Sequence, residues 1–212
     1  MRITKTALVG VAVVFAGLAV LAGRMFWSRT RTWVLVDMPI SLSEGRIRTP
    51  EFKTNLTAVY LIEIEVEKNM PFDTINCLLG IESDNNHPDK CTNNPSVISA
   101  SWILSRQGIV VARGSTAATT GGDWGTDTIA RRIGSFKSEK GRMYELDVDV
   151  LANGSPLAAG KPRLEVKAHP MYYEDDAFAD IPFFLVAVGI VLVGATIVVL
   201  SILRGRHRSE GL

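Results

Sequence analysis

The residues best suited to binding chemistry lie in the segment TTGGDWGTDT, residues 119–128. An exposed tryptophan is a common contact residue for sugars and proteins, because its ring offers a large area at little entropic cost. Trp124 is therefore the first candidate for a ligand or partner contact. The alternative is that its ring folds back over the end of a β-sheet core, as large aromatic side chains usually do. Charged neighbours would either hold an anionic ligand or balance one another: Asp123, Asp127, Arg131 and Arg132.

A second polar segment carries three candidate metal ligands, Asp84, His87 and Asp89. Their spacing matches no EF-hand, whose required glycine is absent, and zinc would need further histidines or cysteines. Cys77 and Cys91 flank the segment, and an oxidising compartment favours a bond between them. We therefore predict a Cys77–Cys91 disulfide, with two unpaired buried thiols as the alternative, and no metal or other cofactor.

Catalytic residues are scarce. The chain has three histidines and contains no nucleophile elbow, HExxH motif or glycine-rich phosphate loop. We expect a non-catalytic protein. An enzyme of the cell envelope stays an alternative, because a catalytic triad is recognised by its geometry rather than by its sequence.

Two acidic ladders follow strand spacing, one at residues 63, 65 and 67 and one at residues 145, 147 and 149. On neighbouring strands they would line one surface that binds a cation or a basic partner, but like charges directly opposed destabilise a sheet. We expect solvated outer faces that are partly paired with basic side chains. The candidate partners are Arg46, Arg48, Arg163 and Lys167.

The elements that would position these residues have a period of two. Residues 60–67, 144–150 and 163–168 alternate apolar and charged side chains, as half-buried strands of an antiparallel sheet do. The turn Asn153-Gly154-Ser155 is expected to join the last two strands as a hairpin. Further strands are predicted over residues 33–40, 74–79, 97–104, 109–112 and 129–136, with a hairpin loop at 105–108.

No soluble helix is expected, so the fold class is an all-β extracytoplasmic domain flanked by two transmembrane α-helices. The number of short strands predicts an antiparallel β-sandwich, Ig-like or jelly-roll. The pattern from Phe136 through Gly141 and Tyr144 to Leu146 resembles the glycine-then-tyrosine start of a late strand in many sandwich domains. That resemblance implies that the Tyr144 hydroxyl bonds back to the preceding connection.

Two uncharged apolar runs frame this domain. Residues 181–203 form a run of 23 residues, long enough as a helix to cross the hydrocarbon core of roughly 30 Å. Residues 7–23 are at the short limit and extend towards Trp27, so residues 7–27 are expected to form a retained anchor or, alternatively, a signal peptide. Interfacial aromatic residues are expected next to the runs: Trp27, Tyr172, Tyr173 and Phe178.

Charge sets the expected orientation. Residues 1–6 and the basic tail 204–212 carry the positive flanks that stay cytoplasmic, which places residues 28–175 outside the cytoplasm of a plasma (inner) membrane. Residues 33–180 hold 15 basic against 21 acidic side chains, a net charge of −6. A domain of this charge, without basic clusters, is not a nucleic-acid binder.

The expected function is therefore protein interaction, or assembly of a membrane complex, by the extracytoplasmic domain. Its expected partners are the lipid bilayer and a membrane or envelope protein. The alternative is a carbohydrate-binding module in which the Trp124 segment contacts a glycan.

Overall fold

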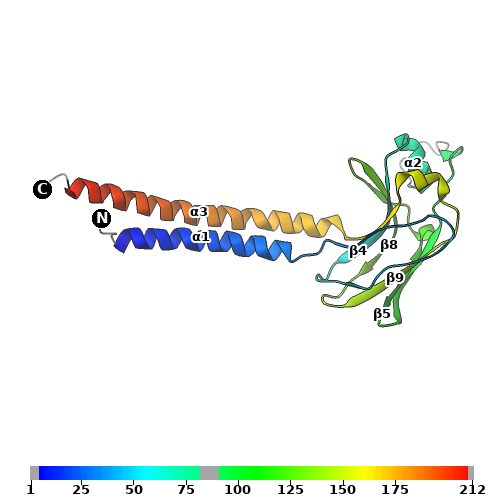
Figure 1. Ribbon diagram of the computed structural model, residues 1–212, viewed down its shortest axis with the longest axis horizontal. Coiled ribbons are helices and arrows are strands. Elements are labelled where there is room, and N and C mark those ends of the chain that lie inside the picture. The colour runs from blue at the N-terminus through cyan, green and yellow to red at the C-terminus, as the bar shows by residue number, and fades with distance from the viewer. Residues whose placement is uncertain (1–4, 82–90, 210–212) are drawn as a thin grey trace. The chain divides into compact units, whose positions relative to one another are not determined.

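The chain forms two units, which we describe one at a time. The computed structural model describes residues 5–81 and 91–209. Residues 32–170 form a β-rich unit, and the residues up to 31 and from 171 onwards form a helical unit (Figure 1).

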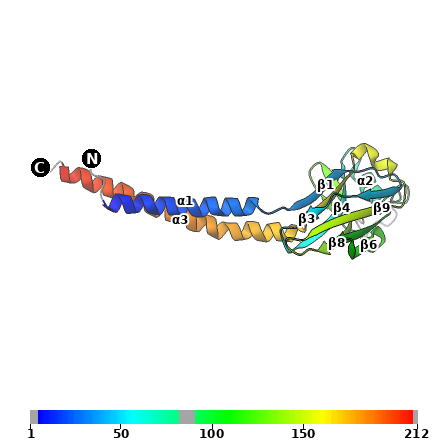
Figure 2. The same cartoon turned by 60° about the horizontal axis from the view of Figure 1, so that its bottom comes forward.

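The helical unit consists of α1 (Lys5–Arg29) and α3 (Pro170–Ser209), both long and apolar enough to cross a membrane. They lie side by side and antiparallel in both views (Figures 1 and 2). Helix α3 begins well before the apolar run predicted at 181–203. Tyr172, Tyr173 and Phe178 therefore lie on its first turns, while Trp27 lies in the last turn of α1.

Small residues spaced seven apart form the contact between the two helices. Gly10 and Gly17 are buried on α1, and Ala187 and Gly194 are buried on α3. A Cβ atom added to Gly10 would lie 2.9 Å from the carbonyl oxygen of Gly194, and one added to Gly17 would lie 3.0 Å from that of Ala187. The two backbones therefore touch at two layers one heptad apart, which only small residues permit.

A charged pair occupies the next layer of this small-residue stripe. Arg24 follows Gly17 by seven residues and Asp180 precedes Ala187 by seven, and the Arg24 Nε donates to Asp180 Oδ1. The Arg24 guanidinium also lies 5.6 Å from the centre of the Phe183 ring. The register of the helices is thus fixed by glycine contacts along the apolar part and by an ion pair at one end.

The β-rich unit contains two antiparallel sheets. The first has the strand order β1-β10-β4-β8-β7 and the second β2-β9-β5-β6, with β3 also paired to β9. The strands of the first sheet are β1 (Val34–Pro39), β10 (Arg163–Ala168), β4 (Val59–Glu67), β8 (Thr128–Lys137) and β7 (Gly122–Trp124). The others are β2 (Gly45–Arg48), β3 (Phe52–Lys53), β9 (Met143–Val150), β5 (Ala100–Arg106) and β6 (Ile109–Ser115).

Trp102 of β5 links the two sheets. Its ring is buried, and its Nε1 donates to the carbonyl oxygen of Ile133 on β8, 2.9 Å away. Gly134 on β8 and Gly114 on β6 leave room for the ring, because an added Cβ would lie 2.2 Å and 2.8 Å from its atoms. Four aromatic rings pack against one another in a second cluster, those of Phe52, Tyr60, Phe136 and Tyr144. The Tyr144 hydroxyl accepts from the Glu139 backbone N–H at 3.1 Å, as the resemblance implies.

The strand predicted over residues 74–79 is wrong, as is the expectation of no soluble helix. These residues belong to α2 (Phe72–Leu79), which buries Ile75, Leu78 and Leu79 and packs beside β8 of the first sheet. The helix ends at Gly80, whose φ of 72° lies in the left-handed region. The Gly80 N–H donates to the carbonyl oxygen of Cys77 at 2.9 Å and closes the last turn. The predicted cysteine pair is at disulfide distance, with the Cα atoms of Cys77 and Cys91 5.2 Å apart.

The hairpin predicted through Asn153 is also wrong. Strands β9 and β10 belong to different sheets, and the 3₁₀ helix η3 (Ser155–Gly160) lies between them along the chain. The tight turn at 105–108 is confirmed, with φ of 52° at Gln107 and 77° at Gly108, the positive pair of a type I′ hairpin.

Gly17→Leu should force the two helices apart. Its side chain would meet the backbone of Ala187, and overpacking of this kind costs about 1–3 kcal/mol. Spin labels at exposed Leu18 and Leu192, in the full chain in nanodiscs, should report a longer and broader distance distribution. Gly23→Leu is the matched control, because nothing lies within 4 Å of an added Cβ there. Equal distributions for both variants would show that the glycine contacts do not hold the pair.

Candidate interaction surfaces

Trp124 lies at the edge of the first sheet in a fixed position. Its Nε1 donates to Asn76 Oδ1 of α2 at 3.1 Å, and its side chain is 52% exposed. The turn that follows is held by Lys68, whose Nζ donates to the carbonyl oxygens of Gly125 (2.5 Å) and Thr126 (3.0 Å). The ring is therefore neither free on a loose loop nor buried over the core.

The charged residues predicted around Trp124 do not form one site with it. Asp123 points to the opposite face of β7, where it pairs with Arg132 at 3.3 Å. Arg131 is buried and donates to the carbonyl oxygens of Gly80, Thr116 and Thr119, so its role is to hold loops. Asp127 is exposed, and its carbonyl oxygen accepts from the Lys68 N–H.

Glu63 is the centre of a charged cluster on the outer face of the first sheet. The prediction of a solvated Glu63 is wrong, since its side chain is fully buried (0% exposed). Lys167 Nζ lies 2.8 Å from Glu63 Oε2, and Arg132 Nε lies 3.4 Å from Oε1. Asp123 joins the cluster at 3.5 Å from Lys167, and Glu165 lies 3.4 Å from the same ammonium group. Four strands, β4, β7, β8 and β10, are thus tied by ion pairs on this face.

Burial and pairing shift the pKa values in this cluster. Burial raises the pKa of Glu63, although the hydrogen bond and charge of Lys167 oppose that change. Burial acts to lower the pKa of Lys167, but the carboxylates of Glu63, Glu165 and Asp123 together outweigh it, so the pKa is raised overall. The two pKa shifts describe one interaction. Glu63 and its neighbours hold Lys167 protonated, and the Lys167 cation favours the ionised form of Glu63. The cluster is an internal ion-pair network rather than a site open to a ligand.

The other acidic ladder is paired at the surface with two of the predicted basic partners, Arg46 and Arg48. Arg48 Nε lies 2.8 Å from Asp147 and Arg46 Nε lies 3.0 Å from Asp149, both across the β2–β9 pair. The six carboxylates do not share a surface, because β4 and β9 lie in different sheets.

The sequence reasoning missed an apolar sheet edge at β6. Ile109, Val110 and Val111 are 70%, 54% and 44% exposed. Because they are consecutive, they cover both faces of the strand. In the sequence, the exposed edge was indicated only by three apolar residues directly after a tight turn, and such a run is equally typical of a buried strand.

The other three sheet edges carry features that discourage strand addition. Strand β1 contains Pro39, which has no N–H to donate, β7 has three residues, and β2 has four residues with two paired arginines. Strand β6 has seven residues and three exposed apolar side chains in a row. Edges of this kind pair readily with other chains, so β6 is the strongest candidate interaction surface.

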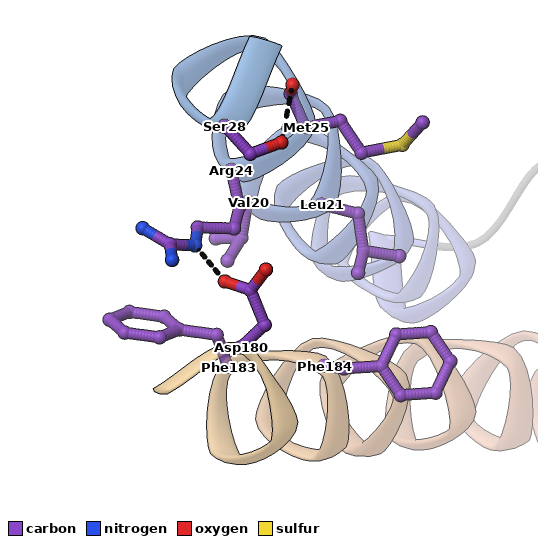
Figure 3. Close-up of a pocket in the computed structure, with 8 residues that line it drawn as sticks. All are labelled: Val20, Leu21, Arg24, Met25, Ser28, Asp180, Phe183 and Phe184. Atoms are coloured by element: carbon purple, nitrogen blue, oxygen red, sulfur yellow. Dashed lines mark hydrogen bonds and ion pairs between the residues drawn. The ribbon is translucent and has the colours of Figure 1, made fainter. Parts of the chain in front are cut away.

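A cavity of about 130 Å³ lies between α1 and α3 (Figure 3). Its lining residues are Val20, Leu21, Arg24, Met25, Ser28, Asp180, Phe183 and Phe184. The volume is well below the roughly 300 Å³ of small-molecule sites, and its two charged groups already pair with each other. We therefore assign no ligand to it.

The metal-ligand candidates Asp84, His87 and Asp89 lie outside the described residues. Within residues 5–81 and 91–209, no group of three or more histidine, cysteine, aspartate or glutamate side chains is arranged to hold a metal ion.

Lys167→Met should destabilise the domain by about 3 kcal/mol at neutral pH, because it leaves Glu63 buried without its nearest cation. The folded-state pKa of Glu63 is raised, so the folded chain binds a proton that the unfolded chain releases. The deficit relative to wild type should therefore shrink as the pH falls from 7 towards the ordinary glutamate pKa. Chemical unfolding followed by tryptophan fluorescence measures it. The double variant Glu63→Gln/Lys167→Met should show no such pH dependence; a deficit independent of pH in the single variant would contradict the assignment.

No family model and no curated protein matches the sequence. Among solved structures, the chain is similar to the protein GEBA250068378 from Sulfurospirillum deleyianum. The two share 14% identity with a TM-score of 0.48, over 64% of this chain and 97% of that one. A likeness at this level carries no inference about function.

Proposed function

We propose that the chain is a non-catalytic protein anchored in a membrane by two helices, whose β-rich domain lies outside the cytoplasm and docks a partner protein. The exposed apolar edge at β6 carries this proposal. A soluble domain gains nothing in folding from three exposed apolar side chains in a row, whereas a protein contact would bury them.

We also propose that α1 stays attached as a transmembrane helix, with both termini in the cytoplasm. Support comes from the fit between the helices, in which Gly10 and Gly17 meet the α3 backbone and Arg24 meets Asp180. A cleaved signal peptide has no need of such a fit. The basic side chains that follow the apolar part of α3 favour a cytoplasmic C-terminus.

For the domain itself we propose an Ig-like sandwich. The central Trp102 and the hydrogen bond from the Glu139 N–H to the Tyr144 hydroxyl are both features typical of that architecture.

Val110→Glu should abolish co-purification of the partner from native membranes, because a charge at the centre of a docked apolar edge weakens binding about 30-fold. Val34→Glu is the matched control, since Val34 is also an exposed valine on an edge strand, in the other sheet. The readout is quantitative mass spectrometry of affinity-purified complexes, with unfolding curves to show that both variants fold. Retention of every co-purified protein by Val110→Glu would rule out docking at this edge.

A glycan-binding role is a second candidate, favoured by the fixed and half-exposed ring of Trp124. The hydrogen bond to Asn76 and the Lys68 contacts present the ring without a large entropic cost. Against this role, the Asp123 side chain lies on the other face of β7, where it pairs with Arg132 of β8, so neither can bind the same sugar beside the ring.

In this second candidate, the full chain in nanodiscs binds a glycan array, and Trp124→Ala removes the signal. Binding to no glycan, or equal binding by Trp124→Ala, would eliminate it. Ile109→Ala is the matched control, because it removes an exposed apolar side chain from the other sheet.

A further inference from the structure

Arg113 differs from the other arginines of the β-rich unit. Seven of the eight arginines in residues 32–170 have carboxylate or carbonyl partners: Arg46, Arg48, Arg106, Arg131, Arg132, Arg142 and Arg163. Arg113 is exposed on β6, and among the described residues it has no ion pair or hydrogen bond from its side chain. In a domain with an excess of acidic side chains, this cation is left available at the apolar β6 edge.

We propose that β6 receives an extended segment of a partner protein that carries a carboxylate opposite Arg113 and apolar side chains opposite Ile109, Val110 and Val111. This inference rests on the proposed docking function and names the chemistry of the partner. The partner carboxylate is inferred from charge complementarity with Arg113. Its β-branched or other apolar residues are inferred from the exposed valines that they would cover.

The register of β6 divides the docking surface into two parts. Ala112, Arg113 and Gly114 pair regularly with Leu104, Ile103 and Trp102 of β5, so their outer edge suits backbone pairing with an added strand. Before Ala112 the register shifts, and Val111 lies opposite no residue of β5. A bulge of this kind interrupts regular pairing, so the partner segment contacts residues 109–111 through side chains.

A second copy of this chain is a poorer occupant of the edge. Strand β6 contains no acidic residue, so two copies paired through it would bring together two arginines and no carboxylate. Arg113 would remain without a counter-ion in such a dimer, and the net negative charge of both domains would oppose association.

The test uses the full chain in nanodiscs and a phage-displayed library of random ten-residue segments. Enriched segments should alternate apolar residues and hold Asp or Glu at one fixed position. Replacing that acid with lysine should weaken binding of the synthetic peptide about fivefold, and Arg113→Glu should reverse the preference. Lys53→Glu makes the same charge change on β3 and should leave the preference unchanged.

Three outcomes would overturn the inference. The first is equal enrichment of acidic and basic segments. The second is selected segments that keep their preference for acid in Arg113→Glu. The third is a photo-crosslinker at Val110 that joins two copies of this chain. Loss of the selected binders in Val110→Glu, with no effect of Arg113→Glu, would support docking at β6 but contradict the proposed carboxylate on the partner. Binding that persists in Val110→Glu would contradict the docking function itself.

Discussion

The pairing of the first strand with the last determines how the β-rich unit is tethered. Strands β1 and β10 are adjacent and antiparallel, with Val34 opposite Lys167, and the Ala168 N–H donates to the carbonyl oxygen of Trp33 at 2.7 Å. The Tyr60 hydroxyl donates to the carbonyl oxygen of Thr32 and fixes the start of the unit. Both chain ends therefore leave the unit at the same edge of one sheet. A domain with separated ends could not join two helices that contact each other along a heptad stripe without long linkers.

The Glu63 cluster shows what keeps the first sheet in register around this edge. Lys167 comes from the strand paired with β1, Glu63 from the next strand and Arg132 from the one beyond. A buried ion pair adds little net stability, because desolvation of both charges offsets their attraction. A slip of one residue, however, would turn Glu63 towards the apolar core without a cation. The cluster therefore contributes specificity of strand pairing, which the tether geometry requires.

The sequence predicted the strands whose alternation is regular, because a half-buried strand shows its two faces directly. Strands β4, β9 and β10 were found in this way. Strands β1, β5, β6 and β8 were predicted from less regular apolar segments, and the turn at Gln107 and Gly108 from its glycine. Helix α2 was missed because eight residues are too few for a helical period to emerge from a run containing Ile75 and Cys77. The burial of Glu63 was missed because alternation identifies an outer face but not which side chains cover it. The exposure of Val110 was missed for the converse reason, since apolar residues in a strand are expected to be covered.

The size of the β6 surface bears on how such an edge could act. Three apolar side chains and one arginine make up a small part of the roughly 800 Å² per partner that a stable protein interface buries. Free in solution, a contact of this size would be weak. A partner confined to the same membrane meets the edge at a much higher effective concentration, which raises occupancy without any further contact. Anchoring by two helices, rather than the area of the edge, would then make docking at β6 effective. The same anchoring would limit the partners to those held at the same surface, so a short apolar edge need not be highly selective by itself.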